Sequence, residues 1–285
     1  MQNIGDSAFL SCRRITHIEI PDGVTSIASG TFGGCTSLES MHFNGTKAEW
    51  DAITKASGWD MGTGNYIITY LGGSENKSST GLEYTLSSDG TYAVSGFGTC
   101  QDTNVIIPAT YNGKPVTSIG SSAFRNCLPL TSIEIPNSVT SIGVSAFRDC
   151  TNIVSIEIPN SVTSIGNGAF YGCSSLVSIT IPEGVTSIGN SAFQYCTSLA
   201  SIKILDGVTS IGIYAFGNCT GLTSIEIPDS VMTIGPVAFS DCTSLANIIF
   251  NGTKAQWNAI TKDSSWDSNT TGNYTIYCTD GELKK

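Results

Sequence analysis

The chain has 285 residues, with 13 Lys and Arg against 23 Asp and Glu, and a formal net charge of −10. This charge disfavours a nucleic acid or an anionic membrane as partner, because both are negatively charged. It mildly favours basic partners or cations. The sequence has no run of about 18 apolar residues, so it predicts no membrane insertion.

Residues 1–75 are predicted to hold two repeats of a truncated first array and a closing cap. Each repeat carries a Phe followed three residues later by a Cys, first Phe9 with Cys12 and then Phe32 with Cys35. The chain starts inside a repeat, so we expect it to be a piece of a longer protein. Residues 76–81 have the polar composition of a linker.

Residues 82–115 are predicted to form the opening cap of a second array. Alternating apolar residues at 82–86 and 91–94 flank Asp89-Gly90, a dipeptide typical of tight hairpin turns. We therefore expect a β-hairpin here. A strand-like segment, 105–108, follows it and leads into the first complete repeat.

Residues 116–249 contain six repeats with a period of 23 residues, as the step from Phe124 to Phe147 illustrates. A constant period of this size is typical of a solenoid, in which each repeat packs on its neighbours. One repeat holds too few apolar side chains to offset the entropy of ordering its backbone, so stability must come from stacking and capped ends. The repeated residues are Phe124, Phe147, Phe170, Phe193, Phe216 and Phe239, and Cys127, Cys150, Cys173, Cys196, Cys219 and Cys242.

Each repeat is predicted to contain two short strands and one short helical segment. Leu130, Ile133 and Ile135 have strand spacing and are followed by Pro136. A tight turn and a second short strand at 139–142 come next. The spacing of the Ala-Phe pair and the Cys predicts one turn of α- or 3₁₀-helix on the opposite side. The predicted fold is thus an α/β solenoid.

Residues 250–280 are predicted to form a C-terminal cap that repeats the segment beginning at Phe43. Both copies contain a capping box, Thr46 with Glu49 and Thr253 with Gln256, which predicts a short helix. The helix would place a Trp over the last repeat. The four tryptophans also suit a carbohydrate-binding surface, an alternative that their exposure or burial would decide: Trp50, Trp59, Trp257 and Trp266.

The Ile-Gly-x-x-Ala-Phe-x-x-Cys-x-x-Leu-x-x-Ile-x-Ile-Pro pattern of residues 1–43 and 116–250 closely resembles the BspA-like (Treponema pallidum type) leucine-rich-repeat proteins of bacterial surfaces. The resemblance implies a right-handed leucine-rich-repeat array. It also implies a cell-surface or secreted, non-enzymatic adhesin that binds a host matrix or cell-surface protein. Alternatives of other classes are a carbohydrate-binding accessory module and a structural spacer.

Eight of the ten cysteines form one repeat column rather than a disulfide framework. Neighbours in such a column are about 4.8 Å apart but point the same way, which does not suit a disulfide. We expect buried, reduced thiols that act as small apolar side chains. Cys100 and Cys278 lie outside the column, and the sequence does not assign them a role.

The candidate partner-binding face consists of charged and polar side chains in two columns. One column follows the outward side of the strands and the other the turns after them. We expect like-charge repulsion between neighbouring Glu134 and Glu157, an ion pair between Lys203 and Glu226, and an acidic edge that could dock a basic surface or weakly bind Ca²⁺. The candidates are Glu134, Glu157, Thr180, Lys203 and Glu226 on the strands, and Glu183, Asp206 and Asp229 in the turns.

No catalytic, metal or cofactor site is predicted. The two histidines, His17 and His42, fall on the first array, in different columns, and an ion pair of His42 with Glu19 suits them better than a metal. The chain has no dinucleotide-binding or Walker motif. A row of threonines could order water, but Thr also suits exposed strands: Thr117, Thr140, Thr163, Thr186 and Thr209.

Overall fold

The computed structural model describes residues 2–63, 66–71, 73–76, 78–270 and 273–285. The chain divides into two compact units. The first comprises Met1–Gly81 and Thr99–Ile106, and the second comprises Leu82–Gly98 and Ile107–Lys285. Both units consist of stacked coils with short parallel strands, so the fold is a β-solenoid.

The first unit has two strand faces and one short helix. Its core contains buried Phe32, Cys35, Met41 and Phe43. Strands β1 (Asn3–Ile4), β3 (Ser26–Ile27) and β5 (Thr54–Lys55) form one face. Strands β2 (His17–Ile20), β4 (Ser40–Thr46), β6 (Ile67–Leu71) and β7 (Gly73–Asn76) form the other; the helix is α1 (Lys47–Ala52), and β10 spans Asn104–Ile106.

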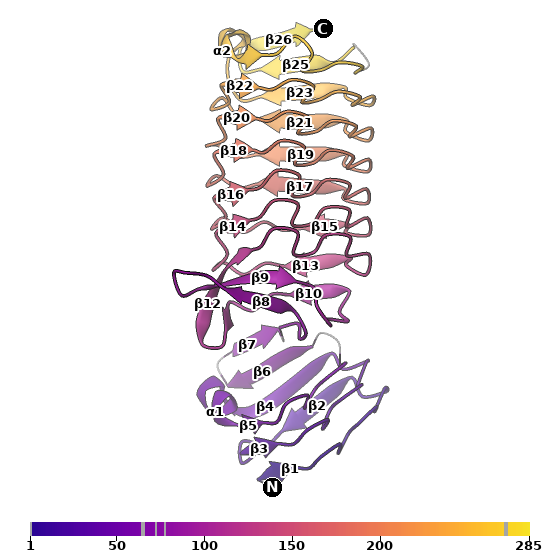
Figure 1. Cartoon of the computed structure of the whole chain (residues 1–285), viewed down its shortest axis with the longest axis vertical. Helices are drawn as coiled ribbons and strands as arrows, with labels where there is room; N and C mark the ends of the chain where they lie inside the picture. Colours follow the sequence, from indigo (N-terminus) through magenta and orange to yellow (C-terminus); the bar gives the residue numbers. More distant parts are fainter. Residues whose placement is uncertain (1, 64–65, 72, 77, 271–272) are drawn as a thin grey trace. The chain divides into compact units, whose positions relative to one another are not determined.

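The second unit stacks its longer strands in chain order, and Figure 1 shows them as successive parallel rungs. These are β13 (Ser132–Glu134), β15 (Ser155–Ile156), β17 (Ser178–Ile181), β19 (Ser201–Ile204), β21 (Ser224–Ile227), β23 (Asn247–Phe250) and β25 (Thr275–Cys278), and β26 (Gly281–Lys284) closes the order antiparallel to β25.

The other side of each coil in this unit carries shorter strands, and β11 (Thr110–Tyr111) pairs with β12. They form two sheets. The first contains β16 (Ser164–Ile165), β14 (Ser141–Ile142), β12 (Lys114–Ile119), β9 (Tyr92–Gly96) and β8 (Glu83–Leu86), in that order. The second contains β18 (Ser187–Ile188), β20 (Ser210–Ile211), β22 (Thr233–Ile234) and β24 (Thr261–Lys262).

The strand register follows the period of 23, so equivalent residues are neighbours. Ser178 pairs with Ser201 and Ile179 with Ile202, and the next residues continue this pairing. Because side chains alternate along a strand, the Ser positions face outward and the Ile positions face the core. The columns expected from the sequence are therefore present.

The third side of each coil differs from the expected helical segment. It consists of hydrogen-bonded turns in which alternate residues bond within the coil and to the next coil. The amide of Ala146 donates to Gly143 O at 3.3 Å, whereas the amide of Phe147 donates to Ala169 O at 2.7 Å. Ser145, with φ +55°, is left-handed, a conformation that a helix excludes.

Two left-handed columns run along this turn face. They contain mostly Gly, Ser, Asn and Asp, the small residues that tolerate positive φ best. The first column is Ser122, Ser145, Gly168, Ser191, Tyr214 and Val237, and the second is Asn126, Asp149, Gly172, Tyr195, Asn218 and Asp241. In the described chain the only α-helices are α1 and α2 (Lys254–Ala259), so the fold has few helices.

Inside the second unit the phenylalanines form a continuous stack. Phe147 and Phe170 have ring centroids 5.4 Å apart and an interplanar angle of 5°. Cys173 is fully buried beside them, and its thiol donates to the carbonyl oxygen of Phe147 at 3.1 Å. Seven of the eight cysteines of the column are buried as expected, and Cys12 is partly buried.

The hairpin expected near Asp89 and Gly90 is present as the antiparallel pair β8–β9. Gly90 has φ +84°, and Asp89 Oδ1 accepts a hydrogen bond from the amide of Thr91 at 3.0 Å. Strand β9 then pairs in parallel with β12 of the first repeat, so the hairpin joins the stack directly.

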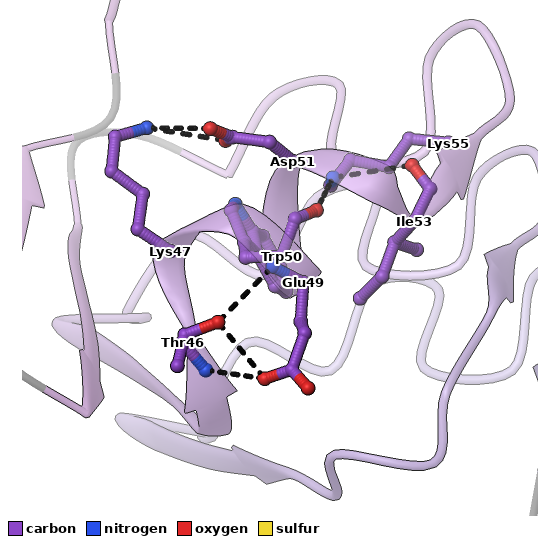
Figure 2. Close-up of polar contacts among 7 residues, drawn as sticks. All are labelled: Thr46, Lys47, Glu49, Trp50, Asp51, Ile53 and Lys55. Carbon is purple, nitrogen blue, oxygen red and sulfur yellow. Dashed lines mark hydrogen bonds and ion pairs between the residues drawn. The ribbon is translucent and has the colours of Figure 1, made fainter.

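The capping boxes of both short helices are formed as the sequence indicates, and Figure 2 shows the one of α1. In α1 the amide of Thr46 donates to Glu49 Oε2 at 2.8 Å, and the amide of Glu49 donates to Thr46 Oγ1 at 3.3 Å. The helix buries Trp50, whose ring lies 4.4 Å from Lys55 Nζ. Trp257 in α2 is buried in the same way and packs on Phe250, with 5.2 Å between ring centroids.

Candidate functional site

An open groove of about 730 Å³ lies over the outward side of β15, β17, β19, β21 and β23 in the second unit. Its lining includes one row of serines and one row of residues that differ between repeats. The buried isoleucines below hold the rows in register. The serine row is Ser155, Ser178, Ser201 and Ser224, and the variable row is Glu157, Thr180, Lys203, Glu226 and Ile249.

The variable row contains one basic group beside an acidic one. Lys203 Nζ and Glu226 Oε2 are 3.6 Å apart, so the expected ion pair is present. Glu226 Oε1 also accepts a hydrogen bond from Asn251 Nδ2 at 3.2 Å. Side-chain exposures of 53% for Lys203 and 29% for Glu226 leave both groups accessible to a partner.

The variable row ends on β23 with an apolar residue. Ile249 follows Glu226 in the strand register and is 43% exposed. The variable row therefore presents acidic, hydroxyl, basic, acidic and apolar groups in that order. Such a surface can contact a protein segment through hydrogen bonds, ion pairs and apolar packing together.

Glu134 and Glu157 occupy equivalent positions in adjacent coils, each one residue beyond the last paired residue of its strand. The paired residues of β13 and β15 are Ser132 with Ser155 and Ile133 with Ile156, and β15 ends before Glu157. Both carboxylates are exposed, and Glu157 lines the groove. Glu134 lies on β13, outside the groove lining.

The acidic turn residues Glu183, Asp206 and Asp229 are exposed and lie outside the groove lining. Asp229 Oδ2 accepts a hydrogen bond from Gln256 Nε2 at 3.3 Å. Within the described ranges, no group of three or more His, Cys, Asp and Glu side chains is arranged to hold a metal ion. The turn position that does reach the groove is Asn160.

The two histidines bond to hydroxyl neighbours. His17 Nδ1 is 2.6 Å from Ser40 Oγ, and His42 Nδ1 is 2.6 Å from Thr69 Oγ1. Glu19 pairs with His42 in the strand register, but its Oε1 accepts a hydrogen bond from Asn44 Nδ2 at 2.9 Å. The described residues therefore show hydroxyl contacts of His42 in place of the expected ion pair.

The tryptophans are packed inside the protein. Trp50, Trp257 and Trp266 are at most 7% exposed, and Trp59 is partly buried against the core of the first unit. The threonine row is also bonded to the backbone, since Thr140 Oγ1 donates to Thr117 O at 3.2 Å. The buried tryptophans therefore offer no open ring surface for a ligand, whereas Thr140, Thr163 and Thr186 remain exposed.

The sequence analysis did not identify the turn face as a candidate binding surface. Tyr195 and Tyr214 are 41% and 40% exposed and lie in the left-handed columns. A signal was available, because a bulky Tyr replaces Gly, Ser, Asn or Asp at these positions. It could be interpreted only once the turns were known to be left-handed there.

Comparison with known proteins identifies the repeats. The sequence matches the BspA type leucine rich repeat region family, with six copies, over residues 2–52, 117–246 and 186–262. No curated protein matched. No described helix has both the length and the apolar character needed to cross a bilayer.

Among solved structures, the leucine rich repeat protein of T. pallidum is 29% identical with a TM-score of 0.58, and the match covers 60% of this chain and 80% of that one. A leucine rich cell surface protein from Faecalibacterium prausnitzii is 30% identical with a TM-score of 0.48, over 91% of this chain and 66% of that one. Since the family match extends over more than half of the sequence, the chain belongs to the BspA-type leucine-rich-repeat family.

Proposed function

We propose that the protein is a non-enzymatic recognition protein of the bacterial surface or extracellular space, which binds a protein partner through the strand-face groove. The observation that carries this proposal is the groove over β15 to β23, lined by a row of residues that differ from repeat to repeat. The core residues below them are nearly constant. A rigid scaffold with variable outward side chains is suited to recognition.

The groove suits a protein segment better than a small molecule. It is open, and its charged, hydroxyl and apolar groups are spread along five strands. A small-molecule site would enclose most of its ligand. The host matrix or cell-surface protein suggested by the family resemblance is consistent with this geometry.

Catalysis has little support from the groove. Its lining contains four serines but no histidine, so a serine there has no neighbouring imidazole base. Membership in the BspA-type family supports a non-enzymatic surface role. We also assign the hairpin β8–β9 and the two Trp-bearing helices the role of covering the ends of the arrays.

The carbohydrate-binding alternative loses its main support because the tryptophans pack inside the protein. Sugar recognition by aromatic stacking requires an accessible ring face. The protein-binding proposal is therefore the stronger one.

The proposal is tested with purified collagen, laminin and fibronectin, immobilised separately, and with a glycan array. We expect saturable binding to at least one protein, and a loss of about tenfold or more in the variant that combines Glu157→Lys with Lys203→Glu. The matched control is Asp206→Asn with Glu183→Gln on the acidic turn edge, which should bind as wild type. Binding to glycans alone, or equal loss in the control variant, would contradict the proposal.

A further inference from the structure

We propose that the turn face of the second unit carries a separate docking surface for an acidic segment of a protein partner. This surface, the tyrosine patch, consists of Arg148, Tyr171, Tyr195 and Tyr214. None of its residues lines the strand-face groove. The inference therefore does not depend on the function proposed for that groove.

The first observation is conformational. Tyr195 and Tyr214 have φ values of +63° and +53°, in columns otherwise occupied mainly by Gly, Ser, Asn and Asp. A left-handed conformation is unfavourable for a large L-residue, and exposures of 41% and 40% leave a large part of each ring accessible to a partner. The fold imposes this conformation in every coil, so the steric cost comes from placing a large residue there, and strained residues of this kind are found at functional sites.

The second observation is that three of the four side chains contact one another across neighbouring coils. The guanidinium carbon of Arg148 lies 4.1 Å from the ring centre of Tyr171. The rings of Tyr171 and Tyr195 have centroids 5.3 Å apart at an angle of 64°. The patch therefore begins as a preformed Arg–Tyr–Tyr cluster.

Tyr214 lies in the next coil, against a glycine whose backbone is bonded to Tyr195. Its Cδ1 is 2.9 Å from the place that a Cβ on Gly217 would occupy. The carbonyl of the same glycine accepts the amide of Tyr195 at 2.9 Å. Preceding repeats carry a side chain at the position of Gly217, namely Arg125, Arg148, Tyr171 or Gln194, so the missing side chain makes room for the ring.

The third observation concerns charge. The cations of residues 116–249 are Arg125, Arg148 and Lys203, and Lys203 pairs with Glu226 on the strand face. The two arginines occupy equivalent positions on the turn face of adjacent coils. Arg148 contacts Asp149 through Nε, with 3.3 Å between Nε and Oδ2, so its terminal amino groups remain for a partner.

The guanidinium of the patch only donates hydrogen bonds, and each phenol hydroxyl can donate one. Among the described residues, none accepts a hydrogen bond from the hydroxyls of Tyr171, Tyr195 or Tyr214. Phenol and guanidinium donors fit carboxylate and carbonyl acceptors, which an acidic polypeptide presents. Tyr and Arg are also enriched among the residues that dominate protein–protein binding.

A polypeptide fits this surface better than an acidic polysaccharide. The rings of Tyr171 and Tyr195 are steeply inclined to each other and do not form a flat platform for sugar rings. Exposed apolar side chains lie on the same face, with Ile213 43% and Val144 50% exposed. They add the apolar contacts that a protein segment can use.

The test uses the whole chain, immobilised on a biosensor, and a soluble copolymer of glutamate and tyrosine as the probe. We expect saturable binding although the protein has a net charge of −10. The variant that combines Arg148→Gln, Tyr195→Asn and Tyr214→Ser should weaken binding at least tenfold. Each replacement is a residue that neighbouring repeats carry in the same column, so the thermal midpoint should be unchanged or higher.

Three outcomes would overturn the proposal. The first is no saturable binding to the copolymer, and the second is unchanged affinity in the triple variant. The third is displacement of the copolymer by polygalacturonate at equal carboxylate concentration, which would indicate recognition of acidic chains in general. The matched control is Lys114→Gln, an exposed position of β12 outside both the groove and the patch, which should bind the copolymer as wild type does.

Discussion

The thiol of Cys173 donates a hydrogen bond to the carbonyl oxygen of Phe147 in the preceding coil, with 3.1 Å between Sγ and O. The same oxygen accepts the amide of Cys150 at 3.2 Å. Each such carbonyl therefore uses both of its lone pairs, one within its coil and one toward the next. The arrangement recurs at Cys35, Cys150, Cys196, Cys219 and Cys242.

Replacing a cysteine of the column should destabilise the second unit. Cys196→Ala removes a fully buried sulfur and leaves the carbonyl of Phe170 without its second donor. We expect a loss of about 1–2 kcal/mol in the free energy of unfolding. Urea denaturation followed by circular dichroism measures it. Cys278→Ala, outside the column, is the control and should change stability by less than about 0.5 kcal/mol.

Alkaline pH should destabilise the fold through the same thiols. Burial raises the pKa of Cys150 and of Cys242 to about 12. Burial also raises the pKa of each thiol between them well above its usual value, at Cys173, Cys196 and Cys219.

The sign follows from proton binding. Above a pH of about 8.5 the unfolded chain releases thiol protons that the folded chain retains, so stability is complete below that pH and falls as pH rises toward 12. Each buried thiol contributes a slope of about 1.4 kcal/mol per pH unit. Urea midpoints between pH 8.5 and 10 measure the slope. The Cys196→Ala variant should show a shallower decrease, and an identical decrease would contradict the assignment.

The left-handed columns predict a stabilising substitution. Val237 is β-branched and has φ +50°. Val237→Gly should raise the unfolding free energy by about 0.5–1 kcal/mol, because glycine adopts this conformation without steric cost.

The matched reverse change is Gly168→Val in the same column, where φ is +60°. A Cβ at Gly168 would meet its nearest neighbour, Ser145 Oγ, at 3.6 Å, so space is available and the cost is mainly conformational. We expect a loss of about 1–2 kcal/mol in urea denaturation. If both substitutions changed the free energy of unfolding in the same direction and by the same amount, the left-handed backbone conformation would not be the cause of the stability change.

The capping box of α1 predicts a pH effect in the first unit. The backbone amide of Thr46 donates to Glu49 and lowers the pKa of its carboxyl. The ionised Glu49 carboxylate therefore stabilises the folded state at pH values above the usual glutamate pKa. This contribution to the free energy of unfolding is lost as the pH falls through the lowered pKa of the folded state.

Glu49→Gln copies the box at Gln256 in α2 and should remove this acid sensitivity while preserving the helix. Glu49→Ala should increase amide exchange across residues 46–53 at neutral pH. Hydrogen-exchange mass spectrometry at pH 3.5 and pH 7 measures both effects. If the amides of residues 46–53 were equally protected from exchange in wild type and Glu49→Ala, the capping box would not stabilise the helix.

The period of 23 predicted the stack, its two strand faces and the buried columns, because repeated apolar residues can be buried only by neighbouring coils. The prediction of a helical segment on the turn face was wrong. The spacing of Ala146, Phe147 and Cys150 fits one turn of helix as well as it fits the turns that are present. Left-handed Ser and Asp residues are recognisable as such only from the backbone.

Part of the groove lining was predicted from the sequence. Alternation along the strands placed Glu157, Thr180, Lys203 and Glu226 on one face, and the structure brings them together. The acidic turn residues were assigned to the same face because charge alone does not reveal the distance between a turn and a strand. The cysteines of the column were predicted to be small buried apolar side chains. Their hydrogen bonds to Phe carbonyls were not predicted, because these bonds depend on how adjacent coils are offset.

Both proposed surfaces depend on the aligned columns of the second unit. The most direct test is alkylation of the native protein at pH 8, with each cysteine followed by peptide mass spectrometry. Partly exposed Cys12 and Cys278 should react rapidly, whereas Cys173, Cys196 and Cys219 should react only after unfolding. Reaction of Cys196 as fast as that of Cys278, or a disulfide between neighbouring cysteines of the column, would contradict the stacked arrangement.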